Sequence, residues 1–241
     1  MRPLLVAFAG GDIGSWAVEW IETVAGAPLK PVSRLAMVEG AQPSGPDGSS
    51  AWVLRGVTSN ERYVSRSEHD ALAAQQEPLG RVGSTRAALI PITKSDAWWE
   101  LAQDERRQIF EERSHHIATG LGYLPAIARR LHHGRDLGEP FDFLTWFEFG
   151  PEHADAFEEL VGRLRETEEW AYVEREIDIR LFREPARRPQ GDPKEWPETR
   201  GVSSRPRVFL KTAAGRHRPG SAAARAGSPG EGASISASSS E

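Results

Sequence analysis

The chain has 241 residues, a formal net charge of −5 at pH 7 and no cysteine. A chain of this length can hold one large domain or two small ones. Without cysteine it cannot form disulfides, iron–sulfur clusters or thiolate metal ligands, and it has no cysteine nucleophile. Residues 185–241 contain ten Lys/Arg and five Asp/Glu, so the remainder carries a charge of −10. An acidic main part argues against nucleic-acid binding as the principal task.

The N-terminal half reads as strands separated by turns. Its first apolar run, residues 4–9, predicts a strand, because six residues are fewer than the roughly 7–15 of a signal-peptide core. No stretch reaches the roughly 20 apolar residues of a membrane helix, so we expect a cytoplasmic protein that does not insert into membranes. Further strands are expected at 34–39, 51–57 and 86–92, with a helix over 67–76.

A histidine in the C-terminal half is expected on the apolar face of a helix. Residues 104–119 are rich in helix formers and contain no Pro or Gly, with Asp104 at the expected N-terminal end. Ile109 and His116 are seven residues apart and therefore share a helix face, whereas His115 falls on the polar side. Two interpretations of His116 are open: a core histidine bonded to a carboxylate or carbonyl, and a ligand.

An arginine on the next element is also expected among apolar neighbours. Glycines at 120 and 122 end the helix, and residues 124–133 then predict a strand in which Ile127, Arg129 and Leu131 share one face. Arg129 could pair with a buried carboxylate, lie on a half-exposed face, or present a permanent charge to an anion. Because buried polar groups are costly unless they are satisfied, His116 and Arg129 together indicate a site between them.

The remaining elements complete a compact α+β pattern. Residues 142–150 alternate and are aromatic-rich, which predicts a strand, and Pro151 then begins a helix. A last strand is expected over 172–182. In it we expect Val173, Ile177, Ile179 and Leu181 to face inward and Glu174, Glu176, Asp178 and Arg180 to face outward. Strand, strand, helix, strand is most of a ferredoxin-like repeat.

The C-terminal segment has a different composition. Residues 184–241 contain seven prolines, many Gly, Ser, Ala and Arg, and few large apolar residues. Such a segment cannot bury enough apolar surface to offset the entropy of ordering it. We therefore expect a disordered tail over 185–241.

Several sequence runs carry a family resemblance. They are SHH at 114–116, YLPAIARRLHH at 123–133, GEPFDFLTWFEF at 138–149, PEHADAFEEL at 151–160 and TEEWAYVEREIDIRL at 167–181. Together they resemble the chlorite dismutase family of haem b enzymes, closely from Lys94 to Phe182 and more weakly before that. The resemblance implies an α+β fold of two ferredoxin-like repeats side by side, of the dimeric α+β barrel type, with antiparallel sheets and helices packed outside. It implies an N-terminal half at 1–93 and a haem-binding half at 94–184.

The resemblance also assigns roles at the iron. In the family a helix histidine is the proximal ligand and a distal arginine follows thirteen residues later, a spacing that His116 and Arg129 share. A buried carboxylate accepts the other N–H of the proximal histidine, and we assign it to Glu169, with Glu168 as the alternative. Such a bond fixes the tautomer and strengthens the ligand.

Further residues are implied in haem contacts. Lys94 lies five positions before Trp99, as in the family, where the lysine reaches a propionate and the Trp98–Trp99 pair packs near the haem and the subunit contacts. Two more positions, Tyr63 and Asn60, are implied near the propionates. On the distal side, Gln76 matches a glutamine of some short members. Gln75 is its alternative.

The implied function is decomposition of the anion chlorite to chloride and molecular oxygen, with haem b as cofactor and a homodimer as the assembly. Two alternatives stay open. One is a coproheme decarboxylase of haem biosynthesis. Against it, Leu89 stands where the tyrosine-dependent type has its reactive tyrosine, and the presence of Arg129 also argues against this function. The other is a non-enzymatic haem-binding or haem-sensing protein, which turnover of chlorite would distinguish.

Overall fold

The computed structural model describes residues 4–40, 50–58 and 63–183, all of which belong to one compact unit within residues 1–190. The expected tail at 185–241 and Asn60 lie outside the described residues.

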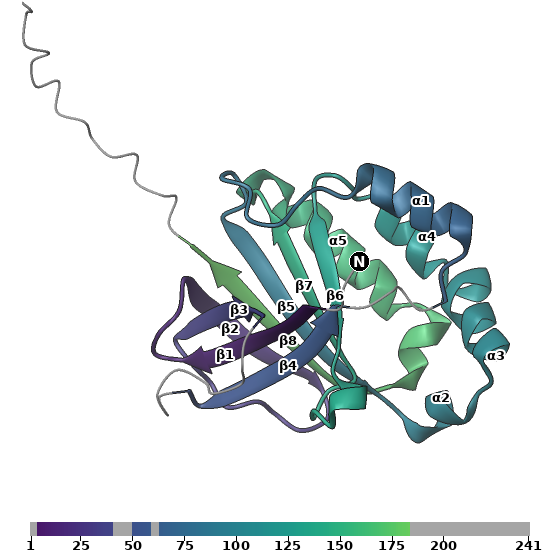
Figure 1. The fold of residues 1–241 in the computed structure, drawn as a ribbon, viewed down its shortest axis with the longest axis horizontal. Helices are drawn as coiled ribbons and strands as arrows, with labels where there is room; N and C mark the ends of the chain where they lie inside the picture. The colour runs from purple at the N-terminus through teal and green to yellow at the C-terminus, as the bar shows by residue number, and fades with distance from the viewer. Residues whose placement is uncertain (1–3, 41–49, 59–62, 184–241) are drawn as a thin grey trace, which may run out of the picture. The chain divides into compact units, whose positions relative to one another are not determined.

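Eight antiparallel strands form a closed barrel in the order β1-β3-β2-β8-β5-β7-β6-β4 (Figure 1). The strands are β1 (Leu4–Gly11), β2 (Trp16–Ala25), β3 (Arg34–Glu39), β4 (Trp52–Thr58), β5 (Arg86–Lys94), β6 (Ala128–His133), β7 (Phe143–Phe149) and β8 (Val173–Phe182). Strands β2 and β8 join the two halves on one side. On the other side β4 meets β6 at the pair Val57 and His133.

Both halves have the strand order of a ferredoxin-like repeat. In the second half, strands β5, β6, β7 and β8 alternate with helices as β-α-β-β-α-β and lie in the order β8-β5-β7-β6. The first half keeps the equivalent order β4-β1-β3-β2. The predicted α+β fold of two such repeats is confirmed. Strand β5, which we expected in the first half, pairs with β7 and β8 and opens the second repeat.

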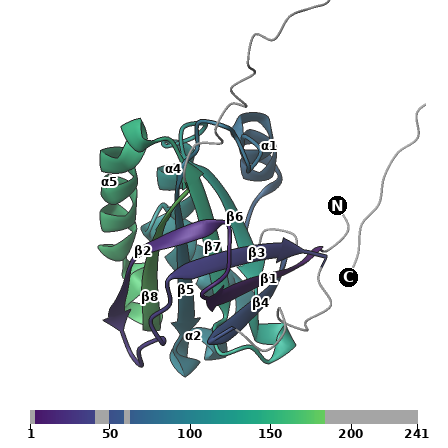
Figure 2. The ribbon, with the colours of Figure 1, turned by 90° about the vertical axis from the view of Figure 1, so that its left-hand side faces the viewer.

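The helices lie on the side of the barrel formed by the second half (Figure 1), and Figure 2 shows β1, β2, β3 and β4 in front of them. The α-helices are α1 (Arg66–Gln75), α2 (Asp96–Glu100), α3 (Gln103–Arg107), α4 (His116–Leu121) and α5 (Ala154–Arg165). Short turns of other types are the π-helical η2 (Gln108–Arg113) and the 3₁₀ segments η3 (Arg135–Leu137), η4 (Pro151–His153) and η5 (Glu168–Tyr172).

Two apolar cores result, one inside the barrel and one between the sheet and the helices. Strand β7 contributes to both by simple alternation: Leu144 and Trp146 pack inside the barrel, whereas Phe143, Phe147 and Phe149 belong to the second core, where the last two contact Phe157 of α5. The site lies on the helix side, so the second core forms its floor.

Of the four charges on β8 that we expected to face outward, Glu174 is exposed, but the other three are buried. Glu176, Asp178 and Arg180 have relative exposures of 1%, 0% and 5%. Helix α5 covers this face, and its Arg165 bonds both Glu176 (2.6 Å) and Asp178 (2.8 Å). The alternation was predicted correctly for Ile177, Ile179 and Leu181, which lie in the barrel core, but Val173 packs against the second core on the helix side. The polar face is buried because the helix above it supplies the opposite charge.

The helix expected over 104–119 is interrupted. It consists of α3, the π-helical η2 and α4, with His115 in the left-handed region at φ 51° between the last two. The new α4 is capped by Glu111, whose carboxylate accepts from the backbone N–H groups of Ile117 (2.6 Å) and Ala118 (3.2 Å). His116 thus stands at the first position of a new helix.

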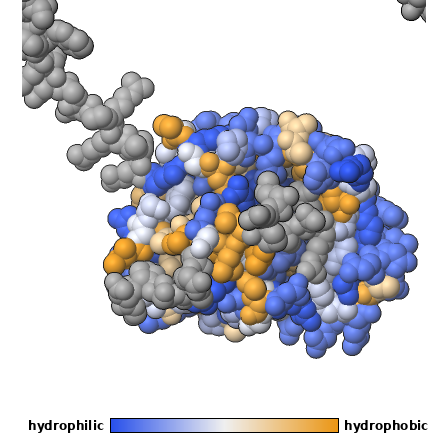
Figure 3. Space-filling view, viewed as in Figure 1, coloured by the Kyte–Doolittle hydropathy of each residue, from blue (hydrophilic) through white to orange (hydrophobic). Residues whose placement is uncertain are grey.

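The strand expected over 124–133 begins later, at Ala128. Pro125 lies in the turns before it and has no N–H to donate to a neighbouring strand. None of the helices in the described part of the chain is long and apolar enough to cross a membrane. Figure 3 shows a mainly hydrophilic surface over the helices and more apolar side chains over the strands of the first half.

Candidate functional site

Helix α4 and segment η5 bring a histidine and a carboxylate together. His116 Nδ1 lies 2.7 Å from Glu169 Oε2, and its ring stacks on Phe110 with centroids 4.4 Å apart. The His116 side chain is 21% exposed. When Nδ1 donates its proton to the carboxylate, Nε2 keeps its lone pair. A ring held in this way is oriented to bind a metal through Nε2.

Glu169, rather than Glu168, makes this contact. Its relative exposure is 3%, and its own N–H donates to the Ser114 hydroxyl at 3.0 Å. Glu168 instead pairs with Arg113 near the surface at 2.9 Å. Burial raises the pKa of Glu169, but its interactions with His116 and Lys94, hydrogen bonds included, outweigh burial and lower the pKa to about 2. Glu169 is therefore an anion at neutral pH.

Lys94 ends β5 and points at the same carboxylate. Its Nζ donates to Glu169 Oε1 at 2.8 Å and to the Glu169 carbonyl at 3.0 Å, and the residue is 2% exposed. Burial lowers the pKa of Lys94, and the charge of Glu169 opposes this shift. We expected Lys94 to reach a propionate. In this structure its ammonium lies on Glu169, because a buried cation requires an anionic partner.

The two tryptophans of α2 have different surroundings. Trp98 is 1% exposed, its ring lies 4.7 Å from Lys94 Nζ, and its buried indole N–H has no hydrogen-bond partner among the described residues. Trp99 donates its N–H to Asp142 at 3.2 Å. The guanidinium carbons of Arg135 and Arg106 lie 4.0 Å and 5.2 Å from the centre of its ring.

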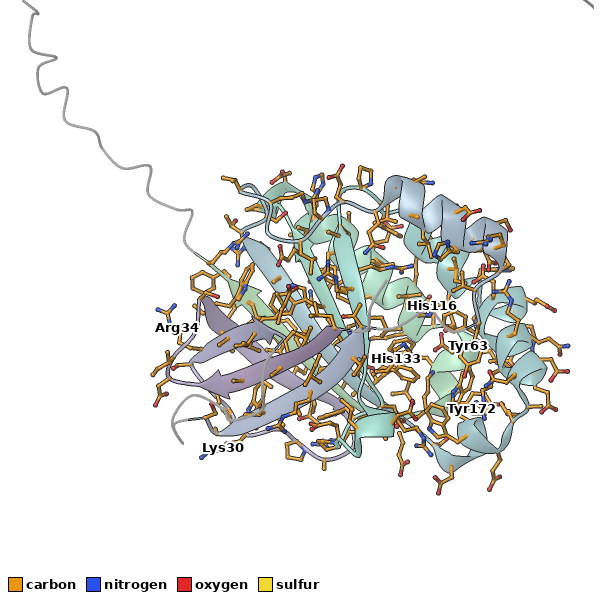
Figure 4. The ribbon with its side chains drawn as sticks, viewed as in Figure 1. Lys30, Arg34, Tyr63, His116, His133 and Tyr172 are labelled. Atoms are coloured by element: carbon orange, nitrogen blue, oxygen red, sulfur yellow. The ribbon has the colours of Figure 1, made fainter. Side chains whose placement is uncertain are left out.

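Tyr63 packs beside these residues. Its ring centroid lies 5.7 Å from Phe110 and 6.1 Å from Trp98, and Arg107 donates to its carbonyl. Figure 4 shows Tyr63, His116, His133 and Tyr172 on the helix side of the barrel, whereas Lys30 and Arg34 lie on the other side. Asn60, expected beside Tyr63, lies outside the described residues.

Arg129 reaches the same helix as His116. A Cβ built on Gly120 would lie 2.0 Å from Arg129 Nη1, so the guanidinium rests on bare backbone one helical turn after His116. Gln76, at the C-terminal end of α1, donates its side-chain amide to the Arg129 carbonyl, whereas Gln75 is the last residue of α1. The structure therefore brings together His116, Arg129, Glu169 and Gln76.

Sequence reasoning missed four residues of this region. The hydroxyl of Ser114 holds the Glu169 backbone, and the missing side chain of Gly120 admits Arg129. Asp142 accepts from the backbone N–H of Lys94 at 2.7 Å, and Trp170 lies beside the Lys94 ammonium. Asp142 had a visible signal, because an acid that opens an aromatic strand is unusual. The other three had none.

The residues present fit a haem held by one protein ligand. His116 has Nδ1 engaged, and its Nε2 makes no hydrogen bond among the described residues. The buried Trp98 N–H is an unused donor of the kind that a bound polar group satisfies. A partly exposed imidazole backed by an anion, with an aromatic ring stacked on it and an arginine resting on the same helix, matches the donor set that haem requires.

The fold and site thus define a class: an antiparallel α+β barrel with a carboxylate-backed histidine and an arginine meeting on one helix. Residues 46–183 match the family model described as chlorite dismutase. A chlorite dismutase from Ideonella dechloratans is 29% identical over 97 residues, which are 39% of this chain and 33% of the relative. The match therefore spans a third of that curated relative.

Solved structures agree. A dimeric chlorite dismutase from Nitrobacter winogradskyi is 59% identical, covering 74% of this chain and 99% of that one, with a TM-score of 0.69. A mutant chlorite dismutase from Candidatus Nitrospira defluvii, 21% identical over 75% of this chain and 92% of that one, supports the fold alone, with a TM-score of 0.56. The chain belongs to the chlorite dismutase family.

Proposed function

We propose that this protein uses haem b to decompose chlorite to chloride and molecular oxygen. The observation that carries the proposal is the meeting of a carboxylate-backed histidine and an arginine at α4. Haem bound at His116 would supply a ferric iron able to accept and return an oxygen atom. The reaction balances without a further reactant, because ClO₂⁻ contains all the atoms and charge of Cl⁻ and O₂.

The protein residues have separate tasks in this proposal. His116 holds the iron through Nε2, and Glu169 fixes its tautomer through Nδ1. Arg129 binds the chlorite anion. It pairs with Phe147 across the β6–β7 ladder and lies between Ile127 and Leu131 on its strand face, and a charge among apolar neighbours is screened less than one in water. A guanidinium in such surroundings also retains the chlorine oxyanion until oxygen–oxygen bond formation is complete.

The test is oxygen evolution by the haem-loaded protein. We expect rapid release of oxygen from chlorite, with large losses in His116→Ala and Arg129→Ala. Arg130→Ala is the matched control, because Arg130 is adjacent in sequence but pairs with Glu39 at 2.9 Å near the surface. Arg129→Ala should also release more hypochlorite to a trapping reagent than wild type. Equal release from both proteins would remove the retention role from Arg129.

Two further measurements, coproheme conversion and the haem spectrum, separate the rival functions. Leu89, which stands at the tyrosine position of the tyrosine-dependent decarboxylases, is fully buried in the barrel core and so faces away from the site. Conversion of coproheme to haem b with peroxide would nevertheless establish the decarboxylase. A normal haem spectrum without turnover of either substrate would favour a sensor.

We also propose a homodimer in the cytoplasm. The Nitrobacter relative is described as dimeric, and it is 59% identical to this chain. Light scattering of the purified protein tests the assembly, and a monomeric mass would refute it. Cell fractionation tests the location, and recovery outside the cytoplasmic fraction would refute that.

A further inference from the structure

Trp170 lies directly after Glu169 in the sequence, and its indole N–H is held by a buried carboxylate. Its indole N–H donates to Glu176 Oε2 at 2.8 Å. Glu176 is 1% exposed and is itself bonded by Arg165 through Nε (2.8 Å) and Nη2 (2.6 Å). Arg165 is on α5 and Glu176 on β8, so the ring is anchored to two major elements of the fold. Its position is therefore strongly determined.

The anchored ring forms one side of a cage around the Lys94 ammonium. Lys94 Nζ lies 5.5 Å from the centre of the Trp170 ring and 4.7 Å from that of Trp98. The third side is Glu169, which accepts two hydrogen bonds from the same nitrogen. Burial strips this ammonium of water, and two indole rings offset part of that loss by attracting the cation. The cage thus holds Lys94 where its charge acts on Glu169.

Lys94 and His116 share the two oxygens of one carboxylate. Oε1 accepts from Lys94 at 2.8 Å and Oε2 lies 2.7 Å from His116 Nδ1. The more firmly the cation sits on Oε1, the weaker the negative charge that the imidazole N–H meets at Oε2. A weaker acceptor leaves less imidazolate character on the ring and makes Nε2 a weaker donor. Any residue that holds Lys94 in place therefore influences how strongly His116 donates through Nε2.

We propose that Trp170, anchored by Glu176, is a positioning residue that keeps Lys94 on Glu169 and so moderates how strongly His116 donates to a bound haem iron. The inference deepens the proposed function, since it requires that the protein bind haem through His116. It does not depend on the identity of the substrate. Its readouts are the iron–histidine stretching frequency of the ferrous protein and the Fe(III)/Fe(II) midpoint potential.

The variants are Lys94→Met, Trp170→Leu and Trp170→Phe, with Trp52→Leu as control. Trp52 also donates its indole N–H, to the Lys30 carbonyl at 2.9 Å, but it belongs to the first half of the barrel. Lys94→Met should raise the iron–histidine frequency and lower the potential, because Glu169 regains its full charge. Trp170→Leu should shift both in the same direction by less. Trp170→Phe keeps a ring but loses the anchor, and its shift should lie between Trp170→Leu and wild type.

The outcomes are distinguishable. If wild type binds haem and Trp170→Leu has wild-type values, or shifts oppositely to Lys94→Met, the inference is wrong and the proposed function survives. If Trp52→Leu shifts as much as Trp170→Leu, the effect is general and the inference is also wrong. If wild type fails to show a histidine-ligated haem, the proposed function fails and the inference falls with it. Should Trp170→Leu not fold, Trp170→Phe and Lys94→Met decide, since an unshifted Trp170→Phe beside a shifted Lys94→Met refutes the role.

Discussion

A buried histidine inside the barrel should make the fold sensitive to mild acid. His132 is 1% exposed, its Nδ1 lies 2.9 Å from the Thr58 hydroxyl, and its ring makes a T-shaped contact with Phe8. Its buried Nε2 has no hydrogen-bond partner among the described residues. Burial, followed by the charges of Arg130 and His133, lowers the pKa of His132 from 6.5 to about 4. The folded protein therefore keeps this ring neutral.

The direction and size of the effect follow from that shift. Between pH 6.5 and about 4 the unfolded chain binds a proton at His132 and the folded chain does not, so stability falls as the pH falls. One pKa unit is about 1.4 kcal/mol, so the full window is worth about 3 kcal/mol. About 2 kcal/mol of this is lost by pH 5. Glu68 and Glu169, whose pKa values are lowered to about 2, lose their contributions mainly below their ordinary value of 4.5. Work above pH 5 therefore avoids most of the loss from these two carboxylates, and comparison with a His132 variant separates His132 from the other histidines.

The assay is denaturant unfolding at pH 7.5, 6 and 5 for wild type and His132→Gln, which keeps a partner for Thr58 but cannot titrate in this range. The variant should be less stable at pH 7.5 but should lose about 2 kcal/mol less than wild type on going to pH 5. His69→Gln is the control, because His69 lies exposed on α1. Equal losses in wild type and His132→Gln would refute the reasoning.

Three further predictions concern the site and the core beneath it. Glu169→Gln should weaken haem binding about 10–100-fold in a haem-transfer titration, whereas Glu168→Gln should bind like wild type; equal affinities for all three would contradict the carboxylate role. Gly120→Val should displace the Arg129 guanidinium and slow oxygen evolution with haem retained, and unchanged turnover would show that the arginine does not need this contact. Leu160 is a residue of α5 that is 1% exposed and packs in the second core. Leu160→Ala should lower the free energy of unfolding by about 2–5 kcal/mol, and a loss below about 1 kcal/mol would contradict this packing.

The sequence predicted those features that depend on local periodicity. The alternating, aromatic-rich pattern of residues 142–150 correctly predicted β7, and alternation placed Arg129 on the same face as Ile127. It identified His116 as the inward histidine and His115 as the exposed one, although the continuous helix used in that argument does not exist. The prediction succeeded because His116 turns toward the buried carboxylate of Glu169, whereas His115 is exposed.

Features that depend on contacts between distant segments could not be predicted. The direction of the Lys94 side chain depends on Glu169, which is 75 residues away, and the choice of Glu169 over Glu168 depends on how η5 turns toward Ser114. The burial of Asp178 depends on Arg165 of a helix packed above it. Strand periodicity gives the face of a residue but not what covers that face.

The break between η2 and α4 explains how one short segment bonds both the backbone and the side chain of Glu169. A regular helix through this region would continue past Ser114 with its backbone bonds in place. The left-handed His115 instead ends one helix and begins another, and Glu111 satisfies the backbone N–H groups that the break exposes. Ser114 is then free to accept from the Glu169 backbone, while His116, two residues on, reaches the Glu169 side chain. A left-handed non-glycine residue costs about 1–3 kcal/mol and persists only where its surroundings determine it. Here those surroundings include the cap by Glu111 and the two bonds to Glu169, so contacts that maintain the left-handed residue also orient the ligand.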